Sequence, residues 1–148
     1  MKVRALNFSD LHPLLGLYRH LNPNDLPLPE GAVVEAVWSE SLANPRMRHF
    51  GAYDGDALVA ACTICVAPNL TRGCRPYALI ENVVTAATHR RRGCGKAVLE
   101  AALSFAWSQN CYKAMLLSGR TEEGVLRFYK SVGFNADEKR GFIARPVA

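Results

Sequence analysis

Hydrophobic and polar positions follow two different periods along the chain, and the changes between them predict the secondary structure. Short runs rich in β-branched and small apolar residues are typical of strands, whereas apolar residues spaced three and four apart are typical of helices. The strand-like segments are residues 2–6, 46–54, 57–67, 76–85 and 111–118. The helix-like segments are residues 9–21, 32–42, 95–110 and 121–133, and we expect residues 134–147 to form a final hairpin.

Local signals mark the ends of these segments. Asp54-Gly55 lies between two strand-like runs and strongly favours a tight hairpin turn. Ser9 or Asp10 is expected to cap the first helix, and Thr121 the last, because short polar side chains accept hydrogen bonds from free N–H groups at helix starts. Residues 22–31 contain three prolines and are therefore expected to form a loop.

The degree of burial predicts how the elements are layered. Residues 76–85 are apolar on both faces, which is typical of a central strand, and residues 111–118 are expected to form a buried strand. The longest helix presents an inward stripe of Val98, Leu99, Ala102, Leu103 and Ala106. The order of the elements predicts an α/β fold of the mixed α+β type, with helices on both faces of the sheet.

Length and composition agree with an ordinary globular domain. The 148 residues are expected to form a single domain, residues 1–148, large enough to fold without a metal or a disulfide. The longest apolar run, residues 57–67, is too short to span a bilayer, so no membrane association is expected.

The number and spacing of the cysteines predict the cellular compartment and argue against a metal site. Five cysteines without framework spacing favour free thiols in a reducing cytoplasm. Cys62 and Cys65 form a CxxC, but they lie on a strand, where side chains three apart point to opposite faces. We therefore expect no metal site, and the absence of a secretory signal supports a cytoplasmic protein.

The segment HRRRGCGK, residues 89–96, joins a predicted strand to the start of the longest helix. Free backbone N–H groups and the positive end of the helix dipole meet there, and Gly93 and Gly95 let the backbone approach a ligand closely. The alternative is that these basic residues are only a solvent-exposed run of charges. This alternative is disfavoured, because positive charges at the start of a helix are repelled by the positive end of the helix dipole. The segment therefore predicts a site for a phosphate-bearing ligand.

Spacing narrows the identity of that ligand. A Walker loop is excluded because Arg90 stands where its first glycine would be, and a dinucleotide fingerprint fails because Val98 replaces its last glycine. Nucleic acid is an alternative, since the net charge is +5, but the chain has no long basic stripe and no exposed aromatic series. We do not expect nucleic acid as a partner.

Two motifs resemble the GNAT superfamily of N-acetyltransferases. Arg90-x-x-Gly93-x-Gly95 after the strand ENVVT is similar to the acetyl-CoA pyrophosphate loop of that family, and FYKSVGF, residues 128–134, is similar to its Tyr-x-x-x-Gly-Phe segment. The resemblance covers essentially the whole chain and is nearest to the small single-domain group that includes glucosamine-phosphate acetyltransferases. That group usually has Ile-Glu-Asp where this chain has Ile80-Glu81-Asn82, so an amino-sugar phosphate is not adopted as the acceptor.

The resemblance implies a fold and a cosubstrate. It implies a mixed, mostly antiparallel sheet with splayed central strands that binds acetyl-CoA. The backbone of Val83, Val84 and Thr85 would pair with the pantetheine arm. The pyrophosphate would be held by the loop residues Arg90, Arg91, Arg92, Gly93, Cys94, Gly95 and Lys96.

The resemblance also implies the chemistry, which is direct acetyl transfer to the primary amine of a small molecule. An alkylamine is mostly protonated at neutral pH, so a base assists its deprotonation. Glu81 is the candidate base, directly or through a water, and its alternative role is a satisfied polar group within the strand. Tyr129 is the candidate acid for the departing thiolate, and its alternative role is a core aromatic.

The sequence constrains the acceptor substrate and the oligomeric state of the protein less than it constrains the fold. In this fold the acceptor enters beside residues 22–31 and 135–141, whose mixed polarity does not identify it. Homodimers are common in the family, so a homodimer is a further expectation that the sequence itself does not test. A non-catalytic acyl-CoA-binding regulatory protein stays open as an alternative, because the same motifs would serve it.

Overall fold

The computed structural model describes residues 1–147 and, within them, places five strands in one sheet with the order β1-β2-β3-β4-β5. The strands are β1 (Lys2–Ala5), β2 (Met47–Asp54), β3 (Ala57–Ala67), β4 (Tyr77–Thr85) and β5 (Ala114–Leu116). Neighbouring strands from β1 to β4 run antiparallel, and β5 runs parallel to β4. The predicted mixed, mostly antiparallel sheet is therefore confirmed.

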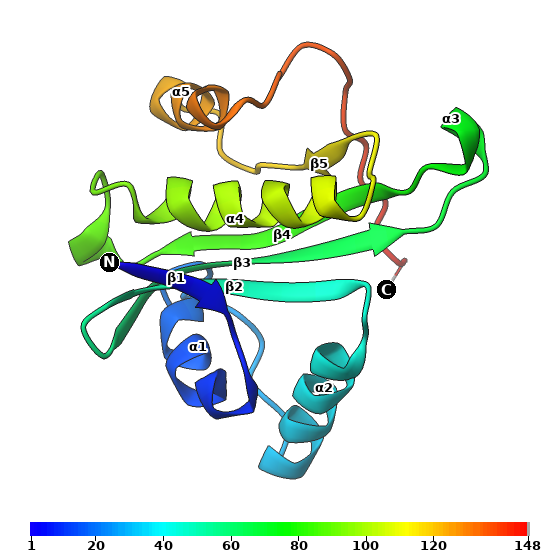
Figure 1. Cartoon of the computed structure of the whole chain (residues 1–148). Helices are drawn as coiled ribbons and strands as arrows, with labels where there is room; N and C mark the ends of the chain where they lie inside the picture. Colours follow the sequence, from blue (N-terminus) through cyan, green and yellow to red (C-terminus); the bar gives the residue numbers. More distant parts are fainter. Residues whose placement is uncertain (148) are drawn as a thin grey trace. The chain divides into compact units, whose positions relative to one another are not determined.

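Helices cover both faces of this sheet, as predicted (Figure 1). α1 (Leu11–Tyr18) and α2 (Gly31–Ala43) lie on one face, and α4 (Cys94–Ser108) lies on the other. Short helical turns join these elements: η1 (Phe8–Asp10), α3 (Thr71–Cys74) and η2 (Ala87–His89). Among residues 1–147, no helix combines the length and the apolar character that crossing a membrane requires.

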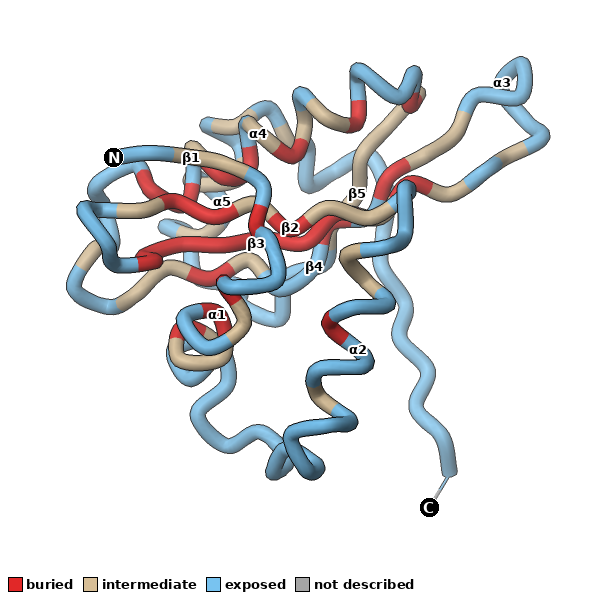
Figure 2. The backbone as a smooth tube through the Cα atoms, turned by 60° about the horizontal axis from the view of Figure 1, so that its bottom comes forward, coloured by how far each residue is buried: buried red, intermediate tan, exposed pale blue. Residues whose placement is uncertain are grey.

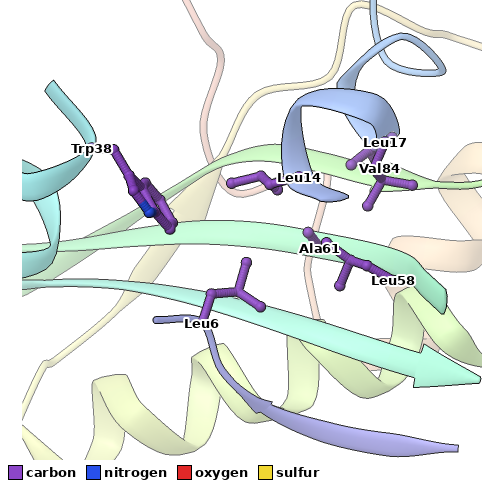
Figure 3. Close-up of a cluster of buried hydrophobic side chains, with 7 residues drawn as sticks. All are labelled: Leu6, Leu14, Leu17, Trp38, Leu58, Ala61 and Val84. Atoms are coloured by element: carbon purple, nitrogen blue, oxygen red, sulfur yellow. The ribbon is translucent and has the colours of Figure 1, made fainter. Parts of the chain in front are cut away.

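Each face of the sheet buries its own set of apolar side chains, and the buried backbone runs along the middle strands (Figure 2). On one face α4 buries Val98, Leu99, Ala102 and Ala106, whereas Leu103 of the predicted stripe is only partly buried. On the other face a cluster forms from Leu6, Leu14, Leu17, Trp38, Leu58, Ala61 and Val84 (Figure 3). Apolar packing therefore holds α1 and α2 in place on the sheet.

The first helical turn begins at a different residue from the one expected. Asn7, rather than Ser9 or Asp10, provides the cap, and its side chain accepts a hydrogen bond from the Ser9 N–H at 3.0 Å. Asp10 is buried, accepts two hydrogen bonds from Arg4 at 2.7 and 2.9 Å, and accepts another from Tyr53. The Arg4 guanidinium in particular holds the pKa of Asp10 well below its usual range.

Two strand predictions need correction. β5 contains three residues and is only partly buried, whereas a buried strand over residues 111–118 was expected. β4 is not buried on both faces, because Ala78 and Ile80 are buried while Leu79 is 43% exposed. Leu79 pairs with Met115 of β5 and is nevertheless exposed, because successive residues of a strand point to opposite faces and only the face of Ala78 and Ile80 is covered here.

The strands, α1, α2 and α4 belong to one compact unit, Met1–Leu116, and a second unit begins at Leu117. In the second unit α5 (Glu123–Val132) begins after Glu122 rather than at a Thr121 cap, and it ends as expected at a left-handed Gly133 with φ of 105°. Residues 134–147 contain no strand, so the predicted final hairpin is wrong. Residues 135–140 lack the alternating apolar positions that would give a strand a buried face.

Candidate active site

The centre of β4 contains a β-bulge. Thr63 pairs with Glu81 and Ala61 pairs with Val84, so one residue of β3 lies opposite the two residues Asn82 and Val83. Asn82 has a left-handed φ of 54°, a conformation that asparagine tolerates better than most residues. Bulges of this kind change the direction in which side chains point and are common beside active sites.

Beyond the bulge, one edge of β4 is open. Pairing with β5 ends at Ile80, and no strand among residues 1–147 pairs with this edge of β4 between Glu81 and Thr85. Backbone N–H and C=O groups on such an edge need hydrogen-bond partners, which a bound extended group can supply. The predicted splaying of the central strands is therefore confirmed.

The open edge leads directly into the basic loop. After η2 the backbone turns through Arg91, with φ of 61°, and Gly93, with φ of 81°, before α4 begins at Cys94. No side chain within residues 1–147 caps the start of α4, so the N–H groups of its first turn are available to an anion. Cys94 and Gly95 are buried, while the side chains of Arg90, Arg91, Arg92 and Lys96 are exposed around them.

The start of the loop is anchored by a hydrogen bond between two side chains. His89 Nε2 lies 3.1 Å from a carboxylate oxygen of Asp54, at the turn between β2 and β3. The side chain of His89, only 20% exposed, is therefore not directed into solvent as a free basic group. This contact connects the loop to the β2–β3 hairpin and limits its movement.

Glu81 lies on the face of the sheet that carries α1 and α2. It is the cross-strand partner of Thr63, and directly paired residues point to the same face. Its side chain is exposed and makes no hydrogen bond or ion pair within residues 1–147. The carboxylate is therefore accessible from solvent, and its role as a base stays a prediction.

A row of polar side chains beneath the sheet was not identified from the sequence. The imidazole of His49 lies 2.9 Å from the Thr63 hydroxyl and 3.0 Å from the Ser41 hydroxyl. Tyr18 of α1 is partly buried against the neighbouring apolar cluster that includes Ala61 and Val84. Burial lowers the pKa of His49 and raises the pKa of Tyr18. The sequence signal for this row was the presence of His49 and Thr63 within the strand-like segments 46–54 and 57–67.

Tyr129 lies on α5, in the second unit. Its ring packs against Phe128 and Phe134 at centroid distances of 5.0 and 6.0 Å, and the residue is only partly buried. This packing is compatible with an aromatic anchor and with a hydroxyl that acts in chemistry, so its role as an acid stays a prediction.

The cysteines are free thiols in the described part of the chain. Burial raises the pKa of Cys62 to about 12, and its thiol donates to the Val98 carbonyl at 3.4 Å. Residues 1–147 contain no group of three or more side chains that could hold a metal ion. Cys62 is thus part of the packing between β3 and α4, whereas Cys65 is only partly buried.

Comparison with known proteins agrees with this geometry. Residues 14–134 match the model of the acetyltransferase (GNAT) family, and the chain therefore belongs to that family of acyltransferases. A glucosamine 6-phosphate N-acetyltransferase of Trypanosoma brucei brucei is 30% identical over 146 residues, which cover 95% of this chain and 92% of that protein. The family match confirms the expected enzyme class and does not favour the nucleic-acid-binding alternative.

Solved structures show the same fold. A candidate acetyltransferase from Agrobacterium tumefaciens strain C58 is 44% identical, with a TM-score of 0.91 over 99% of this chain and 100% of that one. An acetyltransferase of Trypanosoma brucei is 28% identical, with a TM-score of 0.78 over 97% of this chain and 99% of that one.

Proposed function

We propose that this protein transfers the acetyl group of acetyl-CoA directly to the primary amine of a small molecule. The observation that carries the proposal is that two stretches of backbone with free hydrogen-bonding groups follow each other along the chain. The open edge of β4, from Glu81 to Thr85, leads through the basic loop to the uncapped start of α4. An extended molecule with amide groups at one end and phosphates at the other matches both regions.

The residues present fit acetyl-CoA. Val83, Val84 and Thr85 would form strand-like hydrogen bonds with the pantetheine amides, because that edge lacks a strand partner within residues 1–147. The N–H groups from Arg91 to Lys96 would hold the pyrophosphate, with the positive charge of Arg90 and its neighbours beside it. When bound, the thioester supplies the activated acetyl group.

Glu81 is the proposed base. An alkylamine with a pKa of about 10.4 is mostly charged at pH 7, and its proton must leave before the nitrogen attacks. The exposed carboxylate of Glu81 lies directly beside the β4 bulge and close to the proposed thioester site. It would accept the proton directly or through a water.

Tyr129 is the proposed acid for the departing thiolate. Its position in FYKSVGF supports this role, since the family motif carries a tyrosine there. Replacing Tyr129 by Phe removes the hydroxyl and preserves the ring packing with Phe128 and Phe134. We expect a lower kcat with little change in the KM for acetyl-CoA, measured by steady-state kinetics. An unchanged kcat across pH would leave Tyr129 as a packing residue.

The acceptor is expected to be a small amine. The loop over residues 22–30 contains three prolines, which restrict its backbone and favour a preformed pocket over an adaptable groove. The relative from Trypanosoma brucei brucei is named for glucosamine 6-phosphate, and this sugar phosphate belongs in any acceptor screen. Asn82 in place of the usual aspartate argues for including unphosphorylated amines as well.

The test combines binding with turnover. Calorimetry should show acetyl-CoA binding to the wild-type protein. A thiol-release assay should then show turnover with at least one of glucosamine 6-phosphate, glucosamine, spermidine, ethanolamine, lysine, kanamycin and a short peptide. Binding without turnover on any of them would favour the non-catalytic regulatory alternative. Transfer only to folded proteins would contradict the small-molecule acceptor.

A further inference from the structure

Three polar residues form a line across neighbouring strands on the α1–α2 face of the sheet. His49 of β2 pairs with Thr63 of β3, and Thr63 pairs with Glu81 of β4, so the three side chains point to one face. His49 also lies within hydrogen-bonding distance of Ser41 on α2, which identifies that face. His49 is 8% exposed and Thr63 is 7% exposed, whereas Glu81 is exposed to solvent. The line therefore leads from buried packing against α2 to the proposed base.

The hydrogen bonds at the buried end of the line determine the direction of donation. The Ser41 hydroxyl donates its only proton to the Trp38 carbonyl at 3.0 Å. The Ser41 oxygen lies 3.0 Å from His49 Nε2 and must then accept from the imidazole. Burial lowers the pKa of His49 and favours the neutral ring, which carries one N–H. His49 Nδ1 is therefore left as a hydrogen-bond acceptor.

This direction fixes the proton of Thr63. Its hydroxyl oxygen lies 2.9 Å from His49 Nδ1, so Thr63 donates its only proton to the ring. The Trp38 ring packs against the imidazole at a centroid distance of 4.8 Å, which limits rotation of the imidazole. Thr63 thus has no proton left to donate to Glu81 and offers it only an oxygen with acceptor lone pairs.

Two hydrogen-bond acceptors consequently lie opposite one another at the start of the open half of β4. Directly paired residues of antiparallel strands have Cβ atoms about 4.5–5.5 Å apart. The Glu81 carboxylate has no hydrogen bond or ion pair within residues 1–147. A protonated primary amine has three N–H donors and a positive charge, so it can bridge the Thr63 oxygen and this carboxylate. A hydroxyl group has one proton and could satisfy only one of the two.

We infer that the Thr63 hydroxyl oxygen and the Glu81 carboxylate together bind the ammonium group of the acceptor before transfer, and that His49 is a positioning residue that turns the Thr63 proton away from the amine. This inference rests on the proposed function and adds Thr63 and His49 to the acceptor side of the site. Without His49 Nδ1, the Thr63 proton could turn to the carboxylate and occupy an oxygen that the amine needs.

The direction of donation can be tested without any substrate. Long-range ¹H–¹⁵N correlation spectra distinguish the two neutral tautomers of histidine, and His49 can be assigned by comparison with His49→Phe. We expect the tautomer protonated at Nε2 near neutral pH. A tautomer protonated at Nδ1, or a charged imidazolium, would leave Thr63 without an acceptor in the ring and overturn the inference.

The binding role of Thr63 is tested by two substitutions. Thr63→Val removes the hydroxyl and keeps the branched shape, whereas Thr63→Ser keeps the hydroxyl. For the panel amine with the highest wild-type kcat/KM, we expect Thr63→Val to raise the amine KM by about 10-fold or more with little change in kcat. Thr63→Ser should stay near the wild-type KM. The acetyl-CoA affinity should be unchanged in both, which also shows that the variants are folded.

The positioning role of His49 is tested by His49→Phe, alone and combined with Thr63→Val. Phenylalanine keeps a ring against Trp38 but has no acceptor for the Thr63 proton. We expect the amine KM to rise by about 3-fold to 10-fold in His49→Phe. If His49 acts through Thr63, the double variant has the amine KM of Thr63→Val alone, whereas independent effects would multiply.

Tyr53→Phe is the control for a general loss of stability. It removes another side-chain hydroxyl of the same sheet, one that donates to the buried Asp10. It should lower the free energy of unfolding without altering the amine KM. Where Thr63→Val does not fold, the tautomer of His49 in the wild type and the amine KM of His49→Phe decide the outcome.

The outcomes distinguish this inference from the proposed function. An unchanged amine KM in Thr63→Val or His49→Phe, or independent effects in the double variant, would overturn the roles of Thr63 and His49 while the transferase activity stands. Failure of the wild-type protein to acetylate every amine of the panel would overturn the small-amine function, and this inference with it.

Discussion

The two halves of β4 differ in their hydrogen bonding, although they belong to one strand. Tyr77–Ile80 lies between two strands, because β3 pairs along one edge and β5 pairs with Ala78, Leu79 and Ile80 along the other. From Glu81 to Thr85 only the β3 edge is paired within residues 1–147, and a bulge lies at the boundary. A segment with satisfied hydrogen bonds contributes stability, whereas one with open hydrogen bonds is available to a ligand.

The largest expected effect is on catalysis in the open half. Glu81→Gln should lower kcat by about 10²-fold to 10⁴-fold if Glu81 is the base, and higher pH should partly restore the rate by supplying neutral amine. Stability should change by less than about 0.5 kcal/mol, since the side chain is exposed. Steady-state kinetics from pH 6 to pH 9 and urea unfolding measure both quantities. Glu40→Gln, an exposed glutamate on α2, is the control, and an equal loss in that variant would contradict the assignment.

The paired half should respond in the opposite way. Ile80 is 1% exposed, and Ile80→Ala should lower the free energy of unfolding by about 2–5 kcal/mol through lost burial and a residual cavity. Val83→Ala in the open half, where the side chain is only partly buried, should cost clearly less. Urea unfolding of both variants makes the comparison. Equal losses would show that the open edge contributes as much packing as the paired one.

The loop that follows the open half should control cosubstrate affinity. Gly93 has φ of 81° and empty space around it, so Gly93→Val meets no neighbouring atom but strains the backbone at the start of α4. We expect the acetyl-CoA affinity to fall by about 10-fold to 100-fold, measured by calorimetry. Gly73→Val is the matched control, because Gly73 also has a positive φ of 68° and open surroundings. Unchanged affinity in Gly93→Val would remove the loop from the site.

The smallest effect lies away from β4 and depends on pH. The folded-state pKa of Asp10 is depressed, chiefly by its hydrogen bonds with Arg4, so its carboxylate stabilises the folded chain above the unfolded pKa of about 3.9. That stability is lost as pH falls toward the depressed value. We expect the free energy of unfolding to fall by about 1 kcal/mol between pH 4 and pH 3 from this group. Urea unfolding should show this loss in the wild type and not in Asp10→Asn.

Elements with strong local signals were predictable. The Asp54-Gly55 hairpin forms as expected, with Asp54 paired to Ala57, because the turn residues and the flanking strands favour the same geometry. The α4 stripe forms for the same reason, since helical spacing and burial agree. The final hairpin failed because residues 134–147 lack both the alternation and a strand partner in the described structure.

The site was predictable only in part. The basic loop and its glycines are adjacent in sequence, so their spacing alone indicated an anion site. Glu81 was identified as a candidate from its position in the strand, but the sequence did not predict that its side chain is exposed. His49 and Thr63 went unnoticed, because a single polar residue in an apolar strand does not reveal what it contacts.

The sequence by itself determined the periods of its helices and strands, the family motifs and the uncapped glycine start of α4, because each depends on residues close together in the chain. The tertiary structure decided where β4 loses its second partner and which side chains meet beneath the sheet. Ser41, His49 and Thr63 come from three elements, and the hydrogen bonds between them form only when α2 packs on the sheet. Contacts between distant residues depend on that packing, and no local pattern encodes them.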